Sequence, residues 1–257
     1  MRSLILRYKE ATMEKTAAVV LAGGRGTRMG LNTPKQYIKI GGHPLIYYSL
    51  KAFQDSFVDE IVLVCPEEDR EFCASEIVEK YGFSKVKSVV AGGAQRYNSV
   101  YNGLNAIMCI AGGANCKPCD IVFIHDGARP FVTSELITRS YDAACKNHAA
   151  VVAVPVKDTV KIADESGFAK ETVPRESVWL MQTPQVFDYY DIYDAYSKLI
   201  KSEADLAKRG ITVTDDAMVL ELYSERKVKL VMGDYKNIKV TTPEDLILAE
   251  SYLKEGV

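Results

Sequence analysis

The chain has 257 residues, of which 47% are hydrophobic and 26% are charged, and a chain of this length and composition can bury a large core. Lysine and arginine total 32 against 34 aspartate and glutamate residues, which gives a formal net charge of -2. This balance argues against a nucleic-acid-binding protein with a broad positive field, so any anion that the chain binds must meet a local cluster of cations.

Residues 1–15 are predicted to form an N-terminal extension. The apolar run Leu4–Leu6 is much shorter than the ~7–15 residue core of a signal peptide. No apolar run in the chain approaches the ~20 residues that span a membrane. We therefore expect a cytoplasmic protein without a membrane segment, and Met13 could serve as its functional start.

Short hydrophobic runs alternate with segments of helical spacing over the first part of the chain. The expected buried strands are Ala17–Leu21, Ile61–Val64, Val86–Ala91, Ile121–Ile124 and Val151–Val154, and the amphipathic stretches between them are Leu45–Gln54, Glu67–Tyr81, Ser99–Ile110 and Ser134–Asn147. This alternation predicts a Rossmann-like α/β fold with a mostly parallel sheet and helices on both faces. We expect residues 16–257 to form a single domain whose ligands bind beyond the carboxyl ends of the strands.

The pattern changes after Val156 to two strand-like segments, Thr159–Ala163 and Phe168–Val173, separated by the turn-forming run Asp164–Gly167. These segments predict a β-hairpin that protrudes from the main sheet. Its bare edges make residues 157–180 a candidate dimerisation arm, and a hairpin folded onto its own domain is an equal alternative. The remaining elements expected are helices near Asp188–Lys208 and Asp215–Leu222, a strand at Val228–Met232, and a final helix from Pro243.

The six cysteines are not typical of a disulfide framework, which belongs to small secreted folds. Cys109, Cys116, Cys119 and His125 have a spacing that could supply four zinc ligands. A surface connection between a helix and a strand is the stronger interpretation, because a lone C-x-x-C pair is a weak signal and His125 belongs to another motif.

A glycine-rich loop, residues 21–30, follows the first predicted strand. Glycines let the backbone approach a phosphate closely, and exposed N–H groups bind anions. The loop departs from the dinucleotide-binding fingerprint because Met29 stands at the third glycine position, and it lacks the lysine that a P-loop requires. Both common nucleotide-binding folds therefore fit poorly.

Three cations, Arg25, Arg28 and Lys35, lie in or just after this loop. Backbone groups and a helix dipole can hold a diphosphate cofactor, whereas a triphosphate under attack accumulates charge that side-chain cations must neutralise. The loop therefore predicts chemistry at a triphosphate.

The segment Leu21–Met29 with Pro34 and Lys35 resembles the signature loop of the nucleoside-triphosphate transferase family. Within it, the chain is similar to the 2-C-methyl-D-erythritol 4-phosphate cytidylyltransferases of the non-mevalonate isoprenoid pathway. The resemblance covers nearly everything from Ala17 to Leu253. It rests on ordered motifs: Gly23–Met29, Pro34–Gln36, Gly92–Arg96 with Ser99, His125–Pro130, Pro155–Thr159, Arg175, Gln182–Gln185, Thr214–Ala217 and Asn237–Thr242.

The resemblance implies transfer of CMP from CTP to a polyol phosphate, with Mg²⁺ or another divalent cation held mainly by the CTP phosphates and Asp126 as a possible ligand. The catalytic residues implied are Arg28, Lys35, Arg175 and Lys239. Those implied for CTP are Ala22, Gly23, Gly24, Arg25, Gly26, Thr27, Gly93, Ala94, Arg96, Ser99, Asp126 and Ala128. Those implied for the second substrate are Asp126, Thr159, Arg175, Thr183, Thr214 and Lys239. A homodimer is also implied, in which Thr159 and Arg175 reach the partner's site.

Two alternatives remain open from the sequence. A ribitol-5-phosphate cytidylyltransferase shares the glycine loop, the Gln182–Gln185 segment and the late Lys-x-Thr-Thr run. The segments His125–Arg129 and Lys157–Lys161 look more like the methylerythritol enzymes. A non-catalytic nucleotide-binding module is the other alternative, and the presence of all the catalytic cations that the resemblance implies argues against it.

Overall fold

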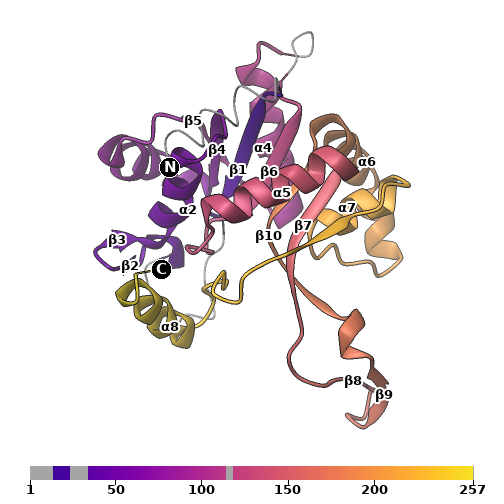
Figure 1. The fold of residues 1–257 in the computed structure, drawn as a ribbon. Coiled ribbons are helices and arrows are strands. Elements are labelled where there is room, and N and C mark those ends of the chain that lie inside the picture. The colour runs from indigo at the N-terminus through magenta and orange to yellow at the C-terminus, as the bar shows by residue number, and fades with distance from the viewer. Residues whose placement is uncertain (1–13, 24–33, 114–117, 257) are drawn as a thin grey trace.

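The computed structural model describes residues 14–23, 34–113 and 118–256. Within them, a seven-stranded sheet has the order β11-β7-β10-β6-β1-β4-β5 (Figure 1). Its strands are β1 (Thr16–Leu21), β4 (Glu60–Cys65), β5 (Val86–Ala91), β6 (Ile121–Asp126), β7 (Ala149–Pro155), β10 (Trp179–Asp188) and β11 (Lys229–Met232). All neighbouring strands are parallel except at β10, which is antiparallel to both β6 and β7. The predicted mostly parallel α/β fold is confirmed.

Helices cover both faces of this sheet because alternate strand residues point to opposite sides. Ala18 and Val20 of β1 pack with α2 (Leu45–Asp55), the π-helical η4 (Cys73–Glu79) and α5 (Ser134–Asn147). Ala17 and Val19 pack on the other face with α4 (Arg96–Ile110), α6 (Tyr189–Lys208) and α7 (Asp216–Tyr223). The remaining short elements before β5 are η2 (Lys35–Tyr37), β2 (Lys39–Ile40), β3 (His43–Pro44), η3 (Glu67–Asp69) and α3 (Arg70–Phe72).

The last helix, α8 (Pro243–Lys254), begins where the sequence predicts. Thr242 is its N-cap and forms a capping box with Asp245, which satisfies backbone N–H groups that lack partners in the first turn. Ala249 of this helix, Val240 and Phe131 belong to one small apolar cluster. The cluster fixes the segment before α8 against the turn that follows β6.

Strand β10 is the central element that the sequence pattern does not predict. It contains Pro184, and proline is found in sheets mainly at edges and irregular positions because it donates no ladder hydrogen bond. The pairing of β10 with β7 is indeed interrupted between Met181 and Gln185. The interruption lets β10 run along β6 and still carry Gln182 and Thr183 under the carboxyl end of that strand.

The predicted hairpin is present as β8 (Val160–Ala163) paired with β9 (Ala169–Val173). Figure 1 shows that it lies away from the body of the molecule, beyond the end of β7. Asp164 closes its turn by accepting hydrogen bonds from the backbone N–H groups of Ser166 and Phe168, both at 2.9 Å. Phe168 at the tip is 72% exposed. The hairpin β8–β9 therefore protrudes from this chain, whereas Trp179 and Leu180, the last residues of the predicted arm, already belong to β10 of the main sheet.

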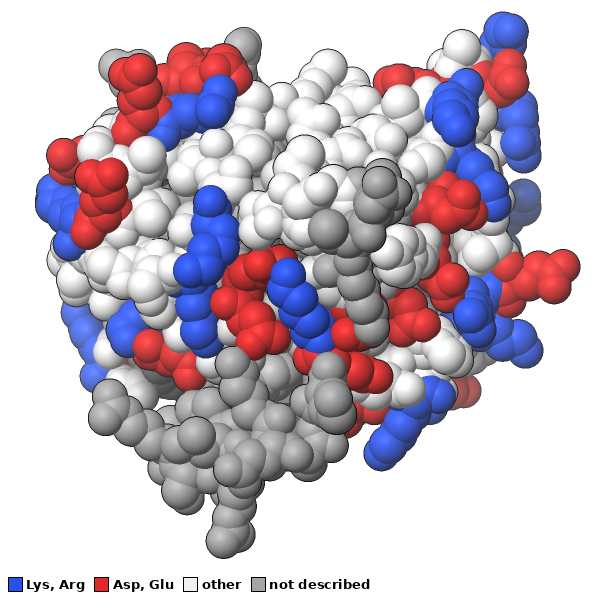
Figure 2. Space-filling model, turned by 90° about the horizontal axis from the view of Figure 1, so that it is seen from above, with Lys and Arg blue, Asp and Glu red and all other residues white. Residues whose placement is uncertain are grey.

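The face drawn in Figure 2 carries charges of both signs. In the view from above, basic and acidic side chains alternate over the described residues, with no broad area of one sign (Figure 2). Among the helices that the structure describes, none is both long enough and apolar enough to cross a membrane.

Candidate active site

A cleft of about 710 Å³ lies beyond the carboxyl ends of β1, β4, β5 and β6. Crevices at this edge of a parallel sheet are where such folds bind ligands. Segments distant in the sequence meet here, and the lining includes Leu21, Gly23, Lys35, Gly92, Gly93, Ala94, Gln95, Arg96, Ser99, Asp126, Ala128 and Lys239. The cleft thus brings together most of the predicted CTP contacts that the structure describes, with two of the predicted catalytic cations.

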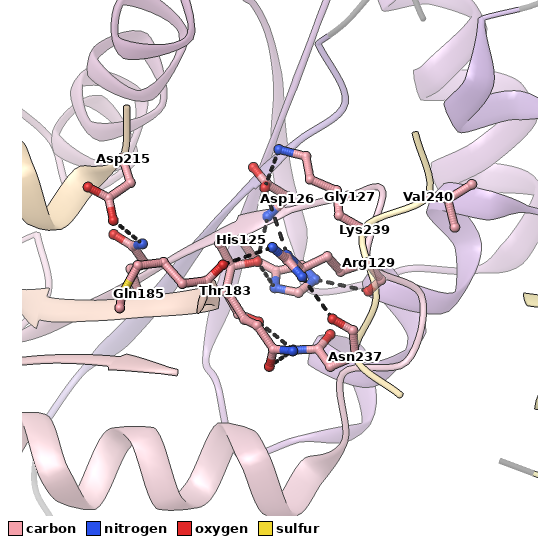
Figure 3. Close-up of polar contacts among 12 residues, drawn as sticks. His125, Asp126, Gly127, Arg129, Thr183, Gln185, Asp215, Asn237, Lys239 and Val240 are labelled. Carbon is pink, nitrogen blue, oxygen red and sulfur yellow. Dashed lines mark hydrogen bonds and ion pairs between the residues drawn. The ribbon is translucent and has the colours of Figure 1, made fainter. Parts of the chain in front are cut away.

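Asp126, the last residue of β6, is the centre of the charges in this cleft (Figure 3). The Lys239 Nζ atom lies 2.7 Å from its Oδ2 atom, the Arg96 Nε atom 3.4 Å from Oδ1, and the Arg129 Nε atom 4.0 Å from Oδ2. Burial alone would raise the pKa of Asp126, but the charges of Arg96, Lys239 and Arg129 hold that pKa well below its ordinary value. Asp126 is therefore ionised and surrounded by three cations, and Glu67 and Glu68 also line the cleft.

Lys35 and Lys239, two of the three predicted catalytic cations among the described residues, lie on one side of the cleft. The Lys35 Nζ atom donates to the backbone oxygen of Val240 at 3.0 Å, and Val240 directly follows Lys239. Residues 205 positions apart in the chain are joined by this bond. An anion in the cleft can therefore meet both ammonium groups.

A buried hydrogen-bond chain beneath Asp126 fixes its backbone. The Asp126 N–H donates to Thr183 Oγ1 at 3.1 Å, and Thr183 Oγ1 lies 3.0 Å from His125 Nδ1. His125 Nε2 lies 3.3 Å from the backbone oxygen of Arg129, which can only accept. The imidazole therefore carries its proton on Nε2 and accepts from the Thr183 hydroxyl at Nδ1. Burial lowers the pKa of His125 to about 4, so the ring stays neutral.

The loop that carries Lys239 is fixed from below by Arg129 and Asn237 (Figure 3). The Arg129 guanidinium donates to the backbone oxygens of Asn237 at 2.8 Å and Met181 at 3.2 Å. Asn237 is fully buried and donates to the backbone oxygen of Thr183 at 2.9 Å. Lys239 thus stands on a segment held by buried hydrogen bonds, and the spacing of the Asn237–Thr242 motif was the sequence signal for it.

The turn between β5 and α4 forms the opposite wall of the cleft. A Cβ atom on Gly93 would lie 2.3 Å from Asn98 Cβ, so no larger residue fits there without a shift. The Gly93 N–H donates to Ser99 Oγ at 3.0 Å, and Gln95 and Asn98 form the capping box of α4. Ser99 therefore shapes the turn, while Ala94 stands exposed at the lip.

The other predicted site residues lie in different surroundings. Ala22 is buried, and its N–H donates to the backbone oxygen of Val64 at 2.7 Å. Thr214 is exposed beside Met218, and Thr159 and Arg175 are exposed on the arm. In this chain none of these four lines the cleft. Predicted residues Gly24, Arg25, Gly26, Thr27 and Arg28 lie outside the described residues.

One buried contact was missed by the sequence reasoning. Arg96 makes a two-point ion pair with Asp216, with both Nη atoms 2.7 Å from a carboxylate oxygen. Asp216 belongs to the Thr214–Ala217 motif, where the prediction concerned Thr214 instead. The signal for this contact in the sequence was Asp216 itself, a second acidic residue directly after the N-cap residue Asp215.

The described residues form no metal centre. No group of three or more His, Cys, Asp or Glu side chains capable of holding a metal occurs among them. His125 has both ring nitrogens engaged with Thr183 and Arg129, so the zinc interpretation fails for this ligand, and Cys116 lies outside the described residues. The Asp126 carboxylate faces three cations and is a poor resident ligand for a divalent metal.

Known proteins resemble this chain over almost its whole length. The sequence model of the family described as 2-C-methyl-D-erythritol 4-phosphate cytidylyltransferase matches residues 16–255. The protein of that name from Clostridium beijerinckii is 45% identical over 242 residues, covering 94% of this chain and 99% of the relative. The one from Geobacter metallireducens is 46% identical over 239 residues, covering 93% and 97%.

Solved structures give the same result. The crystal structure of 4-diphosphocytidyl-2C-methyl-D-erythritol synthase from Anaerococcus prevotii has a TM-score of 0.78 at 35% identity, covering 94% of this chain and 96% of that one. The crystal structure of 2-C-methyl-D-erythritol 4-phosphate cytidylyltransferase from Thermus thermophilus has a TM-score of 0.70 at 29% identity, covering 94% and 100%.

Proposed function

The chain belongs to the 2-C-methyl-D-erythritol 4-phosphate cytidylyltransferase family, and from this premise we propose its reaction. The enzyme transfers CMP from CTP to 2-C-methyl-D-erythritol 4-phosphate. The products are 4-diphosphocytidyl-2-C-methyl-D-erythritol and pyrophosphate, and the reaction serves the non-mevalonate pathway to isoprenoids.

One observation carries this proposal: Lys35, Arg96 and Lys239 converge on a single cleft around Asp126. Two polyanions must meet in the reaction, and their mutual repulsion is the main obstacle. A protein lowers such a barrier by positioning and by charge neutralisation. Lys35 and Lys239, from two distant segments of the chain, supply the neutralising charge, and Arg96 contributes to positioning.

The chemical step needs no protein base. A phosphate-monoester oxygen attacks the α-phosphorus of CTP in line, a new P–O bond forms, and the bond from the α-phosphorus to the bridging oxygen breaks as pyrophosphate leaves. The second pKa of a phosphate monoester is ~6, so the attacking oxygen is already ionised at neutral pH. The neutral, buried His125 fits this account, because no proton has to be taken up.

We assign the roles of the cations from their places along the cleft. Lys35, next to the glycine loop, stabilises the charge that builds up on the α-phosphate and the leaving group, together with Arg28. Lys239 holds the attacking phosphate on the side of Asp126. Leu21, Gly23 and the turn Gly92–Arg96 form the walls for the nucleotide.

Mg²⁺ or another divalent cation is proposed to enter with CTP. The cations around Asp126 support this view, because they leave that carboxylate little capacity for a metal, whereas the triphosphate supplies oxygen ligands of its own. When bound, the metal neutralises phosphate charge.

We propose a homodimer in which the arm delivers Thr159 and Arg175 to the partner's cleft. The exposure of both residues and their absence from the cleft of their own chain support this arrangement. Phe168 at the arm tip, 72% exposed, provides an apolar contact. Light scattering should give twice the mass of the chain, and Phe168→Asp should shift the mass towards the monomer.

The cytoplasm is the proposed location. Cys65, Cys73, Cys109, Cys119 and Cys145 are all free thiols in the part of the chain that the structure describes. Reduced thiols are the rule in that compartment.

Pyrophosphate release tests the whole proposal. The enzyme is mixed with CTP and Mg²⁺ and either 2-C-methyl-D-erythritol 4-phosphate or ribitol 5-phosphate. We expect release with the first compound only. Release with ribitol 5-phosphate alone would identify the other cytidylyltransferase, and no release with either would indicate a nucleotide-binding module.

A further inference from the structure

Asp216, the first residue of α7, lies outside every predicted set of site residues, yet it is joined directly to the cleft. Its side chain is fully buried. Arg96 lines the cleft, and its two Nη atoms each lie 2.7 Å from a different oxygen of Asp216. A two-point contact of this kind fixes the plane of the guanidinium as well as its position.

A second group holds Asp216 from the opposite direction. The hydroxyl of Tyr196 on α6, which is fully buried, donates to Asp216 Oδ1. Burial and the neighbouring Asp216 carboxylate raise the pKa of Tyr196 well above its ordinary value, so it stays a donor. The Asp216 carboxylate is therefore held between the Tyr196 hydroxyl of α6 and the Arg96 guanidinium.

The Asp216 contact also limits what Arg96 can do in the cleft. With both Nη atoms engaged by Asp216 and Nε directed at Asp126 at 3.4 Å, the guanidinium cannot present its fork to a phosphate. The groups it still offers are the remaining Nη hydrogens and the flat face of the ion. Both are suited to the ribose or the base of a nucleotide.

We propose that Asp216 is a positioning residue for nucleotide binding: it orients Arg96 at the cleft wall, and Tyr196 holds Asp216 in turn. This inference rests on the proposed function, since it assigns the nucleotide to the wall that Arg96 forms. Lys239 and Arg129 hold Asp126 without help from Asp216. The site of the second substrate is therefore linked to Asp216 only through the longer Arg96–Asp126 pair at 3.4 Å.

The test is direct binding of CTP with Mg²⁺, measured by calorimetry on the full chain without the second substrate. Asp216→Asn keeps the shape and removes the charge, and we expect the Kd to rise about tenfold or more. In steady state, the KM for CTP should rise similarly, while the KM for the polyol phosphate stays within about twofold. The matched control is Asp215→Asn, which changes the neighbouring carboxylate and keeps an N-cap side chain on α7, and we expect it to bind CTP as the wild type does.

A double-variant comparison separates positioning from general damage. In an Arg96→Met background, Asp216→Asn should add less than about twofold to the Kd, because its target is already gone. If Asp216→Asn does not fold, Tyr196→Phe serves as the test variant, and we expect its Kd for CTP to rise about threefold. Unchanged CTP affinity in a folded Asp216→Asn protein would overturn the inference. If Asp216→Asn does not fold, unchanged CTP affinity in Tyr196→Phe would overturn it. If the wild type binds CTP but releases no pyrophosphate, the proposed reaction fails while this inference stands.

Discussion

Acid should destabilise this protein through His125 before its carboxylates titrate. The ring is completely buried, and burial lowers its pKa from 6.5 to about 4. Asp126 raises that pKa, and the charges of Arg129 and Lys239 lower it further. Protonation would also place a hydrogen on Nδ1, opposite the Thr183 hydroxyl that now donates to it.

The direction of the pH dependence of stability follows from the number of protons bound in the folded and unfolded states. Between pH 6.5 and about 4 the unfolded chain binds a proton at residue 125 and the folded chain does not, so the free energy of unfolding falls as the pH falls. At ~1.36 kcal/mol per pKa unit, the shift corresponds to roughly 3 kcal/mol, of which roughly 2 kcal/mol is lost by pH 5. Above pH 6.5 this loss of unfolding free energy is absent, because His125 is neutral in both states.

Urea unfolding followed by circular dichroism at fixed protein concentration, from pH 4.5 to 8, measures this slope. His125→Asn should be less stable at pH 7 but show a flatter dependence on pH. The control is His148→Asn, which changes an exposed histidine at a positive φ of 67° that asparagine tolerates, and it should keep most of the wild-type slope. A wild-type stability that is constant from pH 6.5 to 4.5, or an equal slope in His125→Asn, would refute the reasoning.

Four further outcomes are expected. Lys35→Met should lower kcat by ~10² with little change in the Kd for CTP, as single-turnover and binding measurements would show. Lys239→Ala should raise the KM for the polyol phosphate at least ~10-fold while the KM for CTP changes little, and equal effects on both substrates would contradict its role. Gly93→Ala should weaken CTP binding, because the added Cβ would lie 2.3 Å from Asn98 Cβ. Arg129→Met should lower the free energy of unfolding by about 3 kcal/mol, since it leaves Asp126, one buried carbonyl and one partly buried carbonyl without this partner, and denaturant titration would measure that loss.

Much of the fold follows from the hydrophobic periodicity of the sequence and from its capping and turn residues. The parallel strands β1, β4, β5, β6 and β7 lie where short valine- and isoleucine-rich runs predict them. The start of α8 was predictable to the residue, because Thr242, Pro243 and Asp245 make a strong local signal. β10 was missed because Pro184 opposes a strand locally, and only pairing with β6 and β7 on either side overrides that preference.

The candidate site was predictable in its residues but not in its connections. Lys35, Arg96, Asp126 and Lys239 were identified by motif resemblance, and the structure places all of them around one cleft. The contact of Arg96 with Asp216 joins residues 120 positions apart. No local pattern encodes which of two adjacent carboxylates will cap a helix and which will turn inward, because that choice depends on helices brought together by the sheet.

The place of β10 in the sheet also bears on how the chain folds. β6 and β7 follow one another along the sequence, but their backbones do not pair, because β10 lies between them. During synthesis, the edge of β6 that faces β10 stays unpaired until residues 179–188 have emerged, after the arm is already made. β10 joins β7 to the sheet that already holds β6, so this long-range pairing is also the step that places Thr183 beneath Asp126.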